Sequence, residues 1–185
     1  MPTAILRPTS TPQETGWSVS NIHTVIGDDD DTTSATQNNI TCSCTCELSD
    51  LDSGLSGATI NSFTISLIGA AGRAGAATVE MELFHSSDGD FATESESFTG
   101  SKSTQTTSAR TTQQDGSSAL TFAYMNDCSV KMNPNTQGIQ AFELFVTVDY
   151  TAASGYGNTV NGVASANIAK VDGVETANIE KVIGV

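Results

Sequence analysis

Apolar side chains recur at every second position in several short runs of this sequence, and this alternation constrains the fold more than any other feature. The clearest run covers residues 141–150, where Phe, Leu, Val, Val and Tyr occupy alternate positions. Successive side chains of a strand point to opposite faces, so such a run predicts a strand with one buried face. No segment sustains the 3.6-residue period of an amphipathic helix. We therefore expect an all-β protein.

The alternating runs are short, and polar turns separate them. The predicted strands cover residues 40–48, 59–68, 77–86, 119–124 and 141–150. Many short strands joined in this way favour a two-layer antiparallel β-sandwich with jelly-roll-like connections. The side chains that we expect to be buried between its layers are Phe63, Ile65, Leu67, Val79, Met81, Leu83, Leu120, Phe122, Phe142, Leu144, Val146 and Val148.

Both ends of the chain differ in pattern from its centre. Prolines interrupt the beginning, which disfavours regular structure there, and the end is a repeat with its own period. The sequence therefore predicts an extended N-terminal arm over residues 1–37, a sandwich domain over 38–153 and a C-terminal repeat arm over 154–185.

The chain is strongly acidic. It has 21 acidic and 7 basic residues among 185, a formal net charge of -14. Binding to duplex nucleic acid needs a basic surface that displaces counterions, so we expect no nucleic-acid partner. No run of about 18 apolar residues indicates a membrane span. The N-terminus lacks the apolar core of a signal peptide, and we expect synthesis in a reducing cytoplasm.

Three of the four cysteines alternate along one predicted strand. Cys42, Cys44 and Cys46 share a face of that strand with Leu48, and Cys128 lies far along the chain. Free cysteine is among the most buried residue types, which favours a role in the core. One disulfide, or a thiolate metal site with Cys128 as fourth ligand, are the alternatives, although structural zinc ligands usually have a different spacing. We expect free, inward-facing thiols and no cofactor.

Other polar residues give no pattern typical of catalysis. His23 and His85 have no nucleophile motif near them, and the Asp run 28–31 lacks the spaced ligands of an EF-hand. A solvated loop is the simpler interpretation of that run, with a calcium site as the alternative. Glu80 and Glu82 share the outer face of one strand, where a glycosidase could place two carboxylates. Solvent-facing side chains are the simpler interpretation, and we expect no enzyme.

The C-terminal segment contains an 11-residue repeat. Residues 160–170 and 171–181 align, with glycines, asparagines, isoleucines and lysines at matching positions, and a third copy begins at 182. The Asp172-Gly173 dipeptide and the β-branched residues favour tight turns and short strands over helix. The segment is too short to bury its own valines and isoleucines. We expect it to contact another chain, with a small hairpin docked on its own domain as the alternative.

Both predicted arms supply candidate interaction residues. In the N-terminal arm these are Leu6 and Trp17, the latter packing either on its own domain or on a neighbouring subunit. The candidates in the repeat arm are Val163, Ile168, Val174, Ile179, Val182 and Val185.

Short motifs along the chain resemble those of known proteins. They are Ile5-Leu6-Arg7-Pro8, Gly16-Trp17, Ile22-His23 with the following Asp run, Val146-Thr147-Val148-Asp149-Tyr150, and Ile168-Ala169-Lys170-Val171-Asp172-Gly173-Val174. Together they resemble small virion proteins of tailed bacteriophages. The resemblance implies a structural protein and carries over no catalytic residue.

This resemblance leads to an expected function. We expect a structural protein on the exterior of a phage particle, most of all a capsid decoration (cement) protein that stabilises the head shell. Its partners would be the major capsid protein or other virion proteins, and it would form a homo-oligomer. The acidic surface fits the exterior, because packaged DNA would repel it. The alternative is a tail, fibre or head-fibre module that contacts the host surface, where aromatic side chains could stack on sugars.

Overall fold

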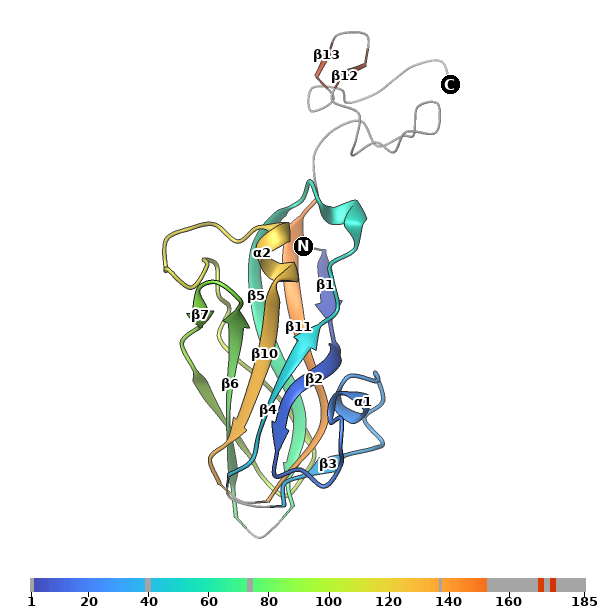
Figure 1. Ribbon diagram of the computed structural model, residues 1–185, viewed down its shortest axis with the longest axis vertical. Coiled ribbons are helices and arrows are strands. Elements are labelled where there is room, and N and C mark those ends of the chain that lie inside the picture. Colours follow the sequence, from blue (N-terminus) through green and yellow to red (C-terminus); the bar gives the residue numbers. More distant parts are fainter. Residues whose placement is uncertain are drawn as a thin grey trace.

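In a computed structural model, the protein forms two antiparallel β-sheets packed face to face (Figure 1). The structure describes residues 2–38, 41–72, 75–136 and 138–152, together with the backbone of residues 170–171 and 174–175. The expected two-layer antiparallel β-sandwich is confirmed.

The first sheet has the strand order β1-β11-β5-β9, and β3 pairs with the far end of β11. Its two long strands, β5 and β11, pair along most of their length and form its centre. The strands of this sheet are β1 (Thr3–Leu6), β3 (Ala35–Thr36), β5 (Thr59–Ala71), β9 (Ser103–Thr106) and β11 (Ile139–Thr151).

The second sheet has the order β2-β4-β10-β6-β7, and β8 also pairs with β6. Its strands are β2 (Pro8–Thr15), β4 (Ser43–Leu48), β6 (Ala77–His85), β7 (Gly89–Asp90), β8 (Glu94–Phe98) and β10 (Cys128–Pro134). The chain passes from one sheet to the other at every connection of the sandwich except those between β6 and β7 and between β7 and β8. This alternation gives the jelly-roll order expected from the sequence.

Short helices and one separate hairpin complete the described structure. The helices are α1 (His23–Ile26), the 3-10 helix η1 (Ser53–Leu55) and α2 (Phe122–Asn126). Strands β12 (Lys170–Val171) and β13 (Val174–Glu175) pair with each other as a two-stranded sheet of their own.

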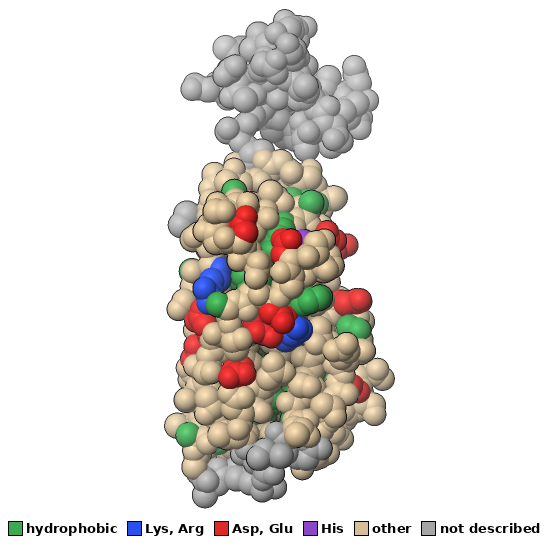
Figure 2. Space-filling view, turned by 60° about the vertical axis from the view of Figure 1, so that its left-hand side comes forward, with side chains coloured by type: hydrophobic (Ala, Val, Ile, Leu, Met, Phe, Trp, Pro, Cys, Tyr) green, Lys and Arg blue, Asp and Glu red, His purple; other side chains and the backbone are tan. Residues whose placement is uncertain are grey.

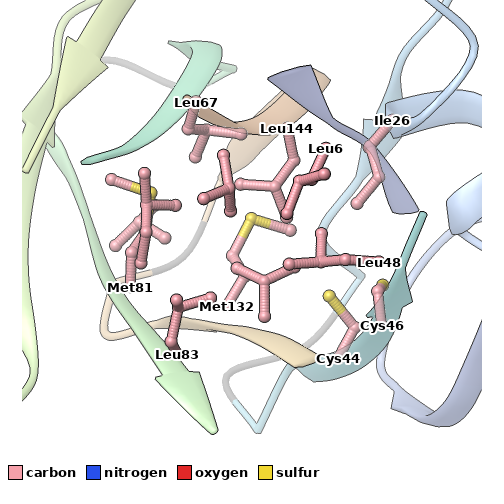
Figure 3. Close-up of a cluster of buried hydrophobic side chains, with 14 of the residues drawn as sticks. Leu6, Ile26, Cys44, Cys46, Leu48, Leu67, Met81, Leu83, Met132 and Leu144 are labelled. Carbon is pink, nitrogen blue, oxygen red and sulfur yellow. The ribbon is translucent and has the colours of Figure 1, made fainter. Parts of the chain in front are cut away.

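The core lies between the two sheets and is built from the inward face of each strand. Figure 3 shows Leu67 and Leu144 of the first sheet opposite Met81, Leu83 and Met132 of the second. Each of these five side chains is at most 1% exposed. The alternation in the sequence therefore identified the buried face of these strands correctly.

The N-terminal segment is not the arm expected for residues 1–37. Strand β1 pairs with β11 of the first sheet, and β2 pairs with β4 of the second. Leu6 is 1% exposed and points into the core beside Ile26 (Figure 3). The prolines misled the sequence interpretation, because Pro8 and Pro12 lie on an edge strand, where a missing N–H donor is tolerated.

Two further details differ from the expected pattern. Residues 122–126 form α2 instead of continuing a strand, since the Thr121 side chain caps this helix by accepting a hydrogen bond from the Tyr124 N–H. Phe122 is consequently only half-buried. Phe142 lies outside the core because the pairing register of β11 shifts between Ala141 and Glu143, which changes the face on which the next residues lie.

Candidate functional site

The two N-terminal candidates for intermolecular contact belong to the core of their own domain. Leu6 lies in β1, and Trp17 is 8% exposed with its indole N–H donating to the Ser43 carbonyl at 3.0 Å. Neither side chain is available to a partner in this structure. Of the two alternatives left open for Trp17, the structure selects its own domain.

The repeat-arm candidates fall mostly beyond the residues that can be described. Val163, Ile168, Ile179, Val182 and Val185 lie outside the described residues. Val174 begins β13, and its backbone pairs with Val171 across the Asp172-Gly173 dipeptide.

The cysteines of β4 point into the sandwich, as expected. Cys42, Cys44 and Cys46 are at most 4% exposed, and all four cysteines, including Cys128, are free thiols. Figure 3 shows Cys44 and Cys46 beside Leu48 on the inner face of the strand. Within the described ranges, no group of three or more His, Cys, Asp or Glu side chains is arranged to hold a metal ion.

Burial and mutual contact shift the acidity of these thiols. Burial raises the pKa of Cys42 to about 12, and burial likewise raises the pKa of Cys128 to about 12. A hydrogen bond between Cys44 and Cys46 raises the pKa of Cys44 well above its usual value and lowers the pKa of Cys46. Three of the four thiols therefore stay protonated and unreactive at neutral pH, which fits a role in packing.

The histidines and paired glutamates each have separate structural partners. His23 Nδ1 lies 2.8 Å from the Thr11 hydroxyl, and the His85 ring stacks on Tyr124 with centroids 3.8 Å apart. Glu80 accepts a hydrogen bond from Asn135, whereas Glu82 accepts one from Thr93. The described structure thus brings none of them together as a catalytic group.

The aspartate run forms a loop that interacts with two basic side chains. Asp29 pairs with Arg7, and Asp31 pairs with Lys102. Asp28 and Asp30 accept hydrogen bonds from backbone N–H groups two residues further on. The aspartate oxygens therefore bond to groups of the protein itself, which agrees with the interpretation of this run as a loop.

A groove of about 630 Å³ lies on the outer face of the second sheet. The residues that line it come from β2, β4, β6 and β10 and from the segments that flank them. They are Pro12, Gln13, Thr45, Glu47, Leu48, Asp50, Phe84, Ser86, Asn126, Asp127, Cys128, Ser129 and Lys131. One aromatic ring, several hydrogen-bonding side chains and charged groups therefore share one concave surface.

The groove carries a net negative charge. Glu47, Asp50 and Asp127 contribute three carboxylates, while Lys131 contributes the one ammonium group among its lining residues. That ammonium group already pairs with Asp90 and lies 4.5 Å from the centroid of the Phe84 ring. Figure 2 shows the same intermixing on one face of the molecule, where basic side chains lie against acidic ones. An anionic ligand would meet repulsion in this groove.

This groove could not be predicted from the sequence pattern. Its lining residues are spread from Pro12 to Lys131, and most of them lie on the outward faces of the strands, for which the sequence gives no pattern. Alternation predicts which side chains of a strand point outward, but it does not predict which strands become neighbours. The order β2-β4-β10-β6 brings these outward side chains together.

Comparisons with known proteins find similarity to solved structures alone. It matches no protein-family model and no curated protein. It is similar to the C-terminal CBM6 module of a marine laminarinase from Zobellia galactanivorans, with a TM-score of 0.46 and 10% identity over 80% of this chain and 98% of that one. It is also similar to a carbohydrate-binding module (CBM6) of lichenase 5A from Cellvibrio mixtus, in complex with cellotriose, with a TM-score of 0.44 and 11% identity over 80% of this chain and 97% of that one. Among the described residues, no helix is long and apolar enough to cross a membrane.

Proposed function

We propose that this protein is a non-catalytic structural protein on the exterior of a phage particle, acting as a capsid decoration (cement) protein. The supporting observation is the contrast between its sandwich and its repeat. The described sandwich buries its apolar side chains, and Ile5 is the one large hydrophobic side chain that it exposes. The valines and isoleucines of residues 160–185 follow its last strand. A partner with an apolar binding surface would therefore contact the repeat, and not the sandwich.

A decoration protein must be stable by itself and soluble at a high copy number. The sandwich meets the first need because β1 and β2 tie the N-terminal segment into both sheets. The net charge of -14 meets the second, since like charges keep copies apart in solution. The same charge suits an outer surface, away from packaged DNA. The major capsid protein or another virion protein would be the partner.

Purified particles provide the test. Quantitative mass spectrometry should find this chain at a copy number that matches capsid symmetry, and immunogold labelling should mark intact heads. Deletion of residues 154–185 should leave a folded sandwich that no longer joins particles. Absence of the chain from particles would refute the proposal, and incorporation of the shortened chain at full occupancy would refute the role of the repeat.

The groove supports a second candidate function, a tail, fibre or head-fibre module that binds the host surface. Sugars are bound by aromatic rings flanked by hydrogen-bonding side chains. Phe84 lies in the groove with Gln13, Asn126 and Ser129, which supply such groups. By contrast, Trp17 and Tyr124 are too buried to stack on a sugar.

A matched pair of variants separates this candidate from the first. Phe84→Ala removes the ring in the groove, whereas Phe142→Ala removes a ring on the first sheet that also lies beneath a lysine, with Lys102 Nζ 5.1 Å from its centroid. If the groove binds host glycans, Phe84→Ala abolishes binding on a glycan array and Phe142→Ala preserves it. If the native protein and the Phe142→Ala control both fail to bind glycans, this candidate is eliminated.

A further inference from the structure

Strand β1 forms an open edge of the first sheet. It pairs with β11 on one side only, with Thr3 opposite Asp149 and Leu6 opposite Val146. The Tyr150 N–H donates to the Pro2 carbonyl, and hydrogen-bonded pairs alternate along an antiparallel ladder. Ala4 and Leu6 consequently bond to β11, while the N–H and C=O groups of Thr3 and Ile5 face away from it.

The outward-facing backbone groups of Arg7, the next residue in this alternation, do have a partner. The Arg7 N–H donates to the Ser49 hydroxyl, and the Arg7 carbonyl accepts from the Ser49 N–H. No described residue satisfies the outward groups of Thr3 and Ile5 in this way. Two alternate positions of β1 therefore offer backbone donors and acceptors to an additional strand.

Strand β1 differs in composition from the other sheet edges. Prolines and two register shifts interrupt β2, glutamates punctuate β8, and β9 is the wholly polar run Ser-Thr-Gln-Thr. Charged residues, prolines and irregularities are the usual means of blocking edge-to-edge pairing. Within β1 there is neither charge nor proline, and Ile5 is 51% exposed. An uncharged edge with an exposed apolar side chain is suited to accept a strand.

An unsatisfied carboxylate oxygen lies beside this edge. Asp149 Oδ1 is buried and has no hydrogen-bond partner among the described residues. Asp149 is directly opposite Thr3, so both side chains lie on the same face of the sheet. A buried acceptor without a donor is costly, and a strand added to β1 could bring a lysine to it.

We propose that β1 accepts a strand from the C-terminal repeat of a second copy of this chain. Among the described residues, strands β12 and β13 pair with each other and with no other strand, and an isolated two-stranded sheet is marginal in water. Each repeat ends in a lysine, Lys170 or Lys181, which could donate to Asp149. Adding the repeat strand to β1 would complete the hydrogen bonding of both partners. This inference extends the proposed function by naming one partner of the repeat.

Sedimentation velocity of the purified full-length chain tests the acceptor edge. The native protein should self-associate with rising concentration, and Ile5→Lys should weaken that association at least about tenfold, because a buried lysine would disrupt the added strand. Thr104→Lys is the control, since Thr104 is also an exposed strand position, on β9 at the opposite edge of the same sheet. A monomeric native protein, or an equal effect of both variants, would overturn the proposal.

Cysteine cross-linking tests the occupant of the edge. A copy carrying Ile5→Cys is mixed with a differently tagged copy carrying Val174→Cys, and the native thiols are buried and do not interfere. A disulfide that joins the two differently tagged copies is the expected result. Cross-linking of Ile5→Cys copies to one another would show β1–β1 pairing instead. A third variant carries both Ile5→Cys and Val174→Cys in one chain. If a disulfide forms within this chain and none forms between differently tagged copies, the repeat docks on its own chain. Either result would overturn the proposed occupant.

These measurements use no particles, so they are independent of the test of the proposed function. A chain that stays monomeric but joins particles would defeat this inference alone. A chain that self-associates through β1 but is absent from particles would defeat the decoration function alone.

Discussion

The guanidinium group of Arg7 bonds to the carboxylate of Glu143 where the N-terminal chain leaves the first sheet and enters the second. Glu143 is 7% exposed, so this ion pair shields a charge that would otherwise be buried alone. Arg7 also pairs with Asp29 and lies 5.6 Å from the centroid of the Phe145 ring. One side chain thus joins the N-terminal segment, the aspartate loop and β11.

Replacing this arginine should destabilise the fold. Arg7→Met leaves Glu143 without its partner, and we expect the free energy of unfolding in urea to fall by about 2–4 kcal/mol. Asp29→Ala is the control, because the Asp29 side chain is 76% exposed and an exposed pair contributes less than about 1 kcal/mol. Equal losses from the two variants would contradict this account.

Stability should fall in alkaline solution because of the buried thiols. Burial raises the pKa of Cys128 from 9.0 to about 12, and also raises that of Tyr124 from 10.0 to about 12. Above pH 9 the unfolded chain loses these protons first, which favours the unfolded state as pH rises. The urea midpoint should therefore be lower at about pH 10 than at about pH 8, and Cys128→Ala should reduce the difference. An identical pH dependence in the variant would argue against this cause.

The single tryptophan should report directly on the integrity of the N-terminal segment. Trp17 is 8% exposed, so its fluorescence should be blue-shifted in the folded protein and shift to longer wavelength on unfolding. Trp17→Ala should cost about 3–5 kcal/mol in urea unfolding, as expected for a large buried side chain. If residues 1–37 were instead a free arm, the native emission would already be that of a solvated tryptophan and the substitution would cost little.

Gly27 should tolerate no side chain. A Cβ atom there would collide with the carbonyl oxygen of Pro8 and would lie 2.8 Å from that of His23, and both are backbone atoms. We expect Gly27→Ala to lower the free energy of unfolding by about 1–3 kcal/mol through overpacking. The control is Gly100→Ala, whose Cβ would have its nearest neighbour, the Ala71 carbonyl oxygen, at 4.0 Å. That variant should unfold at nearly the native urea concentration.

The alternation in the sequence predicted the buried faces well and the local irregularities poorly. Val146 and Val148 are buried as expected, whereas Phe142 is not, because a register shift in β11 intervenes. A bulge depends on the partner strand, which a local pattern does not contain. The alternation of Leu120, Phe122 and Tyr124 predicted a strand, whereas the Thr121 cap begins α2 at this point.

The role of the N-terminal segment depended on contacts that are distant in sequence. Strand β2 reads Pro-Thr-Ser-Thr-Pro-Gln-Glu-Thr and has no alternating apolar residues that would identify it. Its pairing with β4, about thirty residues later, fixes it as a strand. The groove and the open β1 edge likewise follow from strand order, so neither could be anticipated. The thiols of β4, by contrast, were correctly placed because their alternation lies within one strand.

The position of β1 has a consequence for how the molecule folds. Strand β1 is synthesised long before β11, with which it pairs at residues 146–149, so this contact spans most of the sandwich sequence. Native structures dominated by such long-range pairing fold slowly, because loop-closure entropy is lost before the pairing stabilises the chain. The first sheet cannot close until synthesis has passed residue 149, and until then Leu6 lacks its neighbours on β11. A nascent chain that still lacks β11 therefore exposes apolar surface that favours aggregation.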